Sequence, residues 1–247
     1  MRYTHVCFYS AKARKVRMNY WFRILSAFFV LFFVTTSAYA VPKKMTLIYE
    51  VKRDGKLFAN VTETFSQDGK SYSIQSVAKG IGIYALLGER KLISRGEVTK
   101  AGLQPIHFES LQSKKASKAL INDFDWKNHV LNMQIKGEQE QQPLETGTQD
   151  LLSIMYQFMF VPPKGSMIKV PVTIGKKLRT HEYQVKAKPT LLNTRAGSFK
   201  AIELANAGNP EEKKIYLAVD QRYIPVKIEL REDDATIEQI VTKVKFE

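Results

Sequence analysis

The feature that most constrains this chain is an alternation of apolar and polar residues with a period of two, which prevails from Lys44 onward. Successive side chains of a strand point to opposite faces, so this alternation predicts strands with one buried face. Short turn signals, such as Asp54 with Gly55 and Gly208 with Pro210, separate the apolar segments. This spacing is typical of an antiparallel meander. A parallel sheet would need a crossover helix between successive strands, and the short turns between most of these segments leave no room for one.

Thirteen segments follow the alternating pattern, and each is a strand candidate. They are residues 45–53, 56–65, 70–78, 91–99, 103–110, 118–126, 129–136, 167–174, 177–187, 198–205, 213–220, 223–231 and 236–246. One-sided strands in this number can build a single sizeable core. We therefore expect a mainly β protein, in which an antiparallel meander forms a curved sheet or an incomplete barrel, with one domain over residues 41–247.

Two apolar segments interrupt the pattern. Residues 148–161 predict one apolar helix, because Thr148 can cap its start, Asp150 suits the positive end of the helix dipole, and two prolines follow it. Its apolar side chains cover more than half of the circumference, so we expect it to pack against or inside the sheet. Residues 79–90 are apolar but glycine-rich and too short to predict a helix. The polar residues 136–147 predict a loop.

The first forty residues have the layout of a secretory signal peptide. A basic region without acidic residues precedes an apolar run of 11 residues, 24–34, which is short for a membrane span. The small residues Ala38 and Ala40 then form a signal-peptidase site before Val41. We expect cleavage after Ala40 and a periplasmic location; the alternatives are an uncleaved anchor and a true start at Met18.

Charge and cysteine content narrow the class of partner. The six cations of the leader leave 32 Lys and Arg against 24 Asp and Glu, a net charge of +8 in residues 41–247. A moderately basic surface is either simply solvated or attracted to an anionic membrane surface, and the expected compartment speaks against nucleic acid. The sequence has one cysteine, Cys7, which excludes a disulfide scaffold and a cysteine-rich metal site.

Catalytic signatures are missing from the sequence. It contains neither a G-x-S-x-G nucleophile elbow nor an H-E-x-x-H zinc helix, and no G-x-G-x-x-G follows a strand. His107, His129 and His181 stand on different strand candidates, and they form a hydrolytic or metal site only if the sheet brings them to carboxylates. Asp123 and Asp125 share one side of a strand and form either a carboxylate pair or a solvated turn flank. We expect no enzyme, no cofactor and no metal.

Apolar side chains offer a more informative candidate site. Aromatic residues and methionines of the two interrupting segments are of the kind that lines adaptable apolar pockets, although they also fill ordinary cores. The residues that we expect to line such a cavity are Tyr84, Leu87, Leu151, Met155, Phe158 and Met159.

Three stretches of the sequence resemble the exported bacterial proteins of domain-of-unknown-function family 3108. They are residues 49–65, 147–160 and 213–230, and the most specific piece is the pattern of Asp150, Leu151, Leu152, Ser153 and Tyr156. The resemblance implies an all-β envelope protein and assigns no catalytic residue. A looser similarity of architecture, to periplasmic lipoprotein carriers, adds only an analogy about function.

Two functions from different classes follow from these patterns. The first is a soluble, periplasmic, non-catalytic protein that binds a lipid-like or amphipathic envelope component between sheet and helix. The alternative is a structural or adaptor protein that binds another envelope protein through sheet edges or loops.

Overall fold

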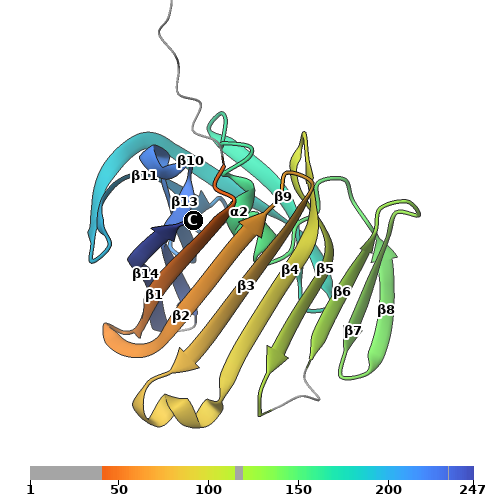
Figure 1. The fold of residues 1–247 in the computed structure, drawn as a ribbon, viewed down its shortest axis with the longest axis horizontal. Helices are drawn as coiled ribbons and strands as arrows, with labels where there is room; N and C mark the ends of the chain where they lie inside the picture. The colour runs from red at the N-terminus through yellow and green to blue at the C-terminus, as the bar shows by residue number, and fades with distance from the viewer. Residues whose placement is uncertain (1–40, 115–118, 233) are drawn as a thin grey trace, which may run out of the picture. The chain divides into compact units, whose positions relative to one another are not determined.

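The first and last strands that the structure describes pair with each other, and this pairing joins two meanders into one antiparallel sheet (Figure 1). The computed structural model describes residues 41–114, 119–232 and 234–247. The expected signal peptide, residues 1–40, lies outside the described residues.

Fourteen strands form this sheet in the described part of the chain, in the order β8-β7-β6-β5-β4-β3-β2-β1-β14-β13-β12-β11-β10-β9. Their bounds are β1 (Lys44–Arg53), β2 (Lys56–Gln67), β3 (Ser71–Gly80), β4 (Glu89–Thr99), β5 (Gly102–Gln112), β6 (Leu120–Asp125), β7 (Val130–Ile135), β8 (Glu138–Pro143), β9 (Met167–Ile174), β10 (Lys177–Thr194), β11 (Gly197–Asn206), β12 (Lys213–Ala218), β13 (Ile224–Glu232) and β14 (Ala235–Phe246). Strands that follow each other in sequence pair with each other, except β8 and β9, between which the sheet stays open. In addition, β1 pairs with β14. The expected mainly β fold with an antiparallel meander is confirmed.

The connection from β8 to β9 lies at this opening and pairs with the β9 edge. Gln149 pairs with β9: its N–H donates to the carbonyl of Pro171 at 2.8 Å, and its carbonyl accepts from the N–H of Thr173 at 2.9 Å. A separate contact comes from the turn between β9 and β10, where Lys176 lies 2.5 Å from the carboxylate of Glu138 in β8. The connection therefore satisfies backbone groups that an open edge would leave to solvent.

The sheet curls around the short helix α2 (Ser153–Gln157), which contacts both β5 and β13. Five strands separate β5 from β13 in the sheet order, so a flat sheet could not bring both to one helix. Tyr156 and Met159 are buried in one apolar cluster with Phe65 of β2, Phe108 of β5 and Val226 of β13. The alternating strand pattern thus provides the apolar inner face, and the connection fills it.

The expected helix over 148–161 is wrong in length, because α2 covers only Ser153–Gln157. Before α2, Gln149 pairs with β9 and therefore does not form a first helical turn. After it, the N–H groups of Met159 and Phe160 bond three residues back, so the segment continues in irregular turns. Within the described residues, no helix has both the length and the apolar character that crossing a membrane requires.

Two strand predictions also differ from the structure. Residues 138–143, expected to be loop, form β8, which is polar because an edge strand at the opening needs no continuous apolar face. Strand β10 continues to Thr194 instead of ending at residue 187, with an irregularity in its pairing to β11 between Lys186 and Thr190, around Pro189.

The glycine-rich interruption expected over residues 79–90 forms the 3-10 helix η1 (Gly82–Leu87). A second 3-10 helix, η3, covers Val219–Gln221.

A buried carboxylate holds α2 against the sheet. Glu63 of β2 accepts a hydrogen bond of 2.6 Å from the hydroxyl of Tyr156 and one of 3.1 Å from Ser76 of β3. The ring of Tyr156 stacks on Phe65, with the centroids 5.5 Å apart. Since apolar contacts have no preferred direction, these hydrogen bonds set the position of the helix over the sheet.

We expect Tyr156→Phe to lower the free energy of unfolding by roughly 1–3 kcal/mol, because it leaves one buried oxygen of Glu63 without this donor. Urea denaturation followed by circular dichroism measures the change. Tyr216→Phe is the matched control, since its hydroxyl bonds Glu229 at the half-buried surface, and we expect a loss below about 1 kcal/mol there. Equal losses in the two variants would contradict the anchoring role of Tyr156.

Candidate functional site

A second buried carboxylate, that of Asp150, begins the helical segment. One of its oxygens accepts hydrogen bonds of 2.8 Å from the backbone N–H groups of Leu152 and Ser153. The other accepts a bond of 2.6 Å from the hydroxyl of Ser94 in β4, which in turn lies 3.0 Å from the hydroxyl of Tyr72 in β3. These bonds tie the first turn of the connection to the inner face of the sheet.

Burial raises the pKa of both interior carboxyl groups. The pKa of Asp150 rises to about 6, although the hydrogen bonds from Ser94, Ser153 and Leu152 oppose the shift. Burial also raises the pKa of Glu63, against hydrogen bonds led by that from Tyr156. Within the described residues, neither carboxyl group forms an ion pair with Lys, Arg or His.

Ser153 is not placed as a nucleophile. Its hydroxyl accepts a hydrogen bond of 2.8 Å from the N–H of Asp150, and it lies 3.4 Å from the carbonyl of the same residue. A nucleophile needs an adjacent base, and in the described part of the chain no histidine bonds this hydroxyl. The hydroxyl of Ser153 therefore bonds the backbone of its own turn and supports the fold.

The sheet brings one of the expected histidines, His107, to one of the expected aspartates, Asp123. His107 lies 2.6 Å from Asp123 through Nδ1, on the solvent side of β5 and β6. Asp125 instead accepts two hydrogen bonds from Asn128 and stabilises the turn after β6, so the two aspartates do not form a pair. Over residues 41–114, 119–232 and 234–247, no three His, Cys, Asp or Glu side chains gather in a way that could hold a metal ion.

The six residues expected to line one apolar cavity are divided between two locations. Tyr84 and Leu87 lie on η1 and are exposed where β3 ends and β4 begins. Phe158 and Met159 are buried among core side chains, and Leu151 and Met155 are half-buried against the same core. The structure does not bring the first pair to the other four.

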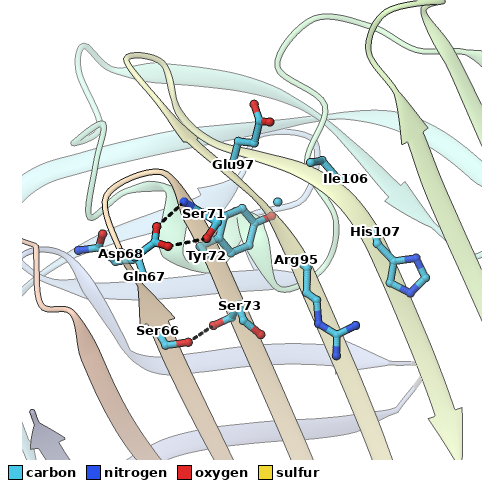
Figure 2. A pocket seen from close by; sticks show the side chains of 11 residues that line it. Ser66, Gln67, Asp68, Ser71, Tyr72, Ser73, Arg95, Glu97, Ile106 and His107 are labelled. Atoms are coloured by element: carbon cyan, nitrogen blue, oxygen red, sulfur yellow. Dashed lines mark hydrogen bonds between the residues drawn. The ribbon is translucent and has the colours of Figure 1, made fainter.

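A groove of about 750 Å³ opens on the outer face of β2–β5 (Figure 2). Strand register places Ser66 opposite Ser73, Ser73 opposite Arg95, and Arg95 opposite His107, so these four side chains form one row across four strands. The turn between β2 and β3 borders one end of the groove. Its lining consists of Ser66, Gln67, Asp68, Ser71, Tyr72, Ser73, Arg95, Gly96, Glu97, Ile106 and His107.

An irregularity in strand pairing shapes this groove. The pairing of β4 with β5 shifts between Arg95 and Gly96, which leaves Ile106 as an extra residue, partly exposed at the groove. A Cβ atom on Gly96 would lie 2.1 Å from the carbonyl oxygen of Gln104 and 2.8 Å from the ring of Tyr72. Only glycine fits at this position, so the close approach of Tyr72 depends on it.

Two exposed charged groups of the groove, Arg95 and Glu97, have no ion pair among the described residues, and Arg95 is the cation of the two. Asp68 accepts hydrogen bonds from Ser71 and Lys70 in its own turn, and these bonds lower the pKa of its carboxyl group. Asp123 is engaged by His107. The alternation of the strand predicts that Arg95 faces outward. Most Lys and Arg side chains of a sheet face outward, so nothing in the sequence distinguished Arg95 as a candidate binding residue.

A solved structure shares this architecture. The chain is similar to the beta-barrel-like protein of domain of unknown function DUF1849 from Brucella abortus, with a TM-score of 0.57 and 11% sequence identity, over 84% of this chain and 99% of that one. By its fold, the chain is therefore an open, barrel-like antiparallel sheet. Curated proteins offer no match.

Residues 46–242 match the model of the family described as protein of unknown function (DUF3108). The chain belongs to this family, as the three resembling stretches of the sequence led us to expect. The structure gives a physical role to the most specific stretch, since Asp150, Ser153 and Tyr156 all make buried hydrogen bonds.

We expect the stability of the protein to depend on pH through Asp150. Because its folded-state pKa is about 6, above the unfolded value, its stabilising contribution is complete below about pH 4 and is lost as the pH rises through 6. The free energy of unfolding should fall between pH 4 and 7.5 by roughly 3 kcal/mol more in the wild type than in Asp150→Asn. Urea titrations across this range measure it, and equal pH slopes would contradict the assignment.

Proposed function

We propose that this chain is an exported, non-catalytic binding protein that takes a lipid-like or amphipathic envelope component in the groove over β2–β5. The observation that carries the proposal is the guanidinium of Arg95, which stands in a groove of about 750 Å³ beside the apolar side chain of Ile106. Location in the periplasm rests on the signal-peptide layout of residues 1–40, and so is part of the same proposal.

The groove presents the two kinds of contact that an amphipathic molecule needs. Arg95 can donate paired hydrogen bonds to a phosphate or carboxylate, and the hydroxyl groups of Ser66 and Ser73 stand in the same row. Ile106 offers an apolar contact next to them. The net charge of +8 in residues 41–247 favours the approach of an anionic component.

Packing of the interior argues for the outer face as the binding site. Ile154, Tyr156 and Met159 are almost completely buried against the sheet. A ligand between the helix and the sheet would have to displace these side chains and the hydrogen bond from Tyr156 to Glu63. A ligand in the groove displaces only solvent.

Fluorescence of Trp126 offers a direct test. It is the one tryptophan after residue 40, and its indole N–H donates to the carbonyl of Pro105, beside the bulge that carries Ile106. We expect a saturable change when lysophosphatidylglycerol is added below its micelle concentration. Arg95→Glu should weaken this binding about tenfold or more, since it removes a charge-assisted pair.

Arg179→Glu is the matched control, because Arg179 is an exposed cation of β10, away from the groove. We expect its affinity to stay within about twofold of wild type, as for other remote surface charges. Calorimetry confirms the binding independently of fluorescence. Equal weakening by the two variants, or no binding by either method, would refute the groove as the ligand site.

The second candidate is an adaptor that binds another envelope protein, and the free edge of β9 favours it. Gln149 occupies the β9 edge only around Val172, and Met167 and Ile174 expose apolar side chains at the two ends of this strand. An extended segment of a partner could add a strand there. Crosslinking from position 167 that captures one defined envelope protein would favour this function over the groove.

A further inference from the structure

Apolar side chains gather on η1, the six-residue connection between β3 and β4. The exposed fractions are 75% for Ile83, 73% for Leu86 and 52% for Leu87, and no residue of η1 is buried. Because β1–β5 are antiparallel, η1 lies at the same end of the sheet as the turn between β1 and β2, where Figure 1 shows it projecting. A concentration of exposed aliphatic groups in so few residues marks a contact surface.

Several interactions hold η1 in this shape. The ring of Tyr84 packs edge-on against Phe58 of β2, with the centroids 4.5 Å apart, and the N–H of Ile81 donates to the carbonyl of Phe58 at 3.0 Å. From β5 and its following turn, Gln112 and Lys114 donate to the carbonyls of Leu87 and Leu86, at 3.4 and 2.9 Å. These contacts hold η1 so that Ile83, Leu86 and Leu87 remain exposed to solvent, whereas Tyr84 of the same segment packs against the sheet.

Cations surround the exposed aliphatic groups. Lys79 precedes η1 and pairs with Glu89 at 3.3 Å, which leaves Arg90 and Lys114 as positive charges without an acidic partner among the described residues. Lys56 stands next to Leu57, a further exposed apolar residue beside Phe58. This pattern of aliphatic tips within a ring of Lys and Arg is what the interface of an anionic bilayer favours.

We propose that η1 docks the protein on an anionic phospholipid membrane, with Ile83, Leu86 and Leu87 inserted among the acyl chains and with Arg90 and Lys114 at the headgroups. Charge complementarity favours an anionic membrane over an uncharged apolar protein surface as the partner of η1. An uncharged partner would leave Arg90 and Lys114 without an opposite charge. The contact is independent of the groove, which lies at the other end of β3.

Vesicle flotation tests this docking. We expect wild-type protein to bind vesicles of one part phosphatidylglycerol to three parts phosphatidylcholine, to bind neutral phosphatidylcholine vesicles at least tenfold more weakly, and to be released by 0.5 M salt. The variant Ile83→Asp with Leu86→Asp should lose at least tenfold in affinity for the anionic vesicles. Leu191→Asp is the matched control, since Leu191 is 67% exposed on β10, and it should bind as the wild type does.

A local probe shows whether η1 itself enters the bilayer. The one cysteine of the sequence is Cys7, so an exported chain that starts at Val41 accepts a single label at Leu86→Cys or, as control, at Leu191→Cys. An environment-sensitive fluorophore should shift to the blue on anionic vesicles at position 86 and not at position 191. Absence of wild-type binding, unchanged binding of the double variant, or equal shifts at the two positions would overturn the proposal.

The two proposals fail separately. Arg95→Glu should bind anionic vesicles as wild type does, and the variant with Ile83→Asp and Leu86→Asp should keep the Trp126 response to lysophosphatidylglycerol. Loss of both responses in the double variant would overturn η1 as an independent membrane contact.

Discussion

Two hydrogen bonds from the helical connection to the sheet determine the rest of this structure. Tyr156 donates to Glu63 and Ser94 donates to Asp150, both in the interior and both without an ion pair among the described residues. Apolar contacts alone would let the short helix slide along the inner face, whereas a displaced helix would leave a buried carboxyl group without its donor. The same two bonds therefore keep the connection at the opening between β8 and β9, where Gln149 can pair with β9.

Because the connection occupies the interior, both of the surfaces that we propose for binding lie outside it. Strand β3 links the two candidate surfaces: its first residues, Ser71 and Tyr72, border the groove, and its last residue, Gly80, leads into η1. At about 3.3 Å per residue, a strand of 10 residues separates its ends by roughly 30 Å. A protein that rests on a membrane through η1 would hold the groove at this distance from the headgroups, within reach of components that project from the bilayer.

Alternation along the chain was enough to predict the antiparallel class and most strands, because one-sided burial leaves a period of two in the sequence. It failed at β8, where an edge strand needs little apolar character, and at the end of β10, where Pro189 breaks the pattern. Tyr84 and Leu87 were expected in a cavity because composition does not say whether an apolar residue faces inward. The groove was out of reach for another reason, since it depends on the register of β4 against β5 and on a missing side chain at Gly96.

Pairing of β1 with β14 has a consequence for the order in which the chain can fold. Lys44 and Glu247, which bond each other at the ends of these strands, are 203 residues apart in sequence. During synthesis, β1 therefore waits for the last strand, and until then the meander β1–β8 has two unsatisfied edges that invite pairing with other chains. Contacts of such long range also make folding slow. A chain with this topology therefore exposes the edge of β1 for as long as β14 has not paired with it, which makes this one pairing the step that protects the sheet from association with other chains.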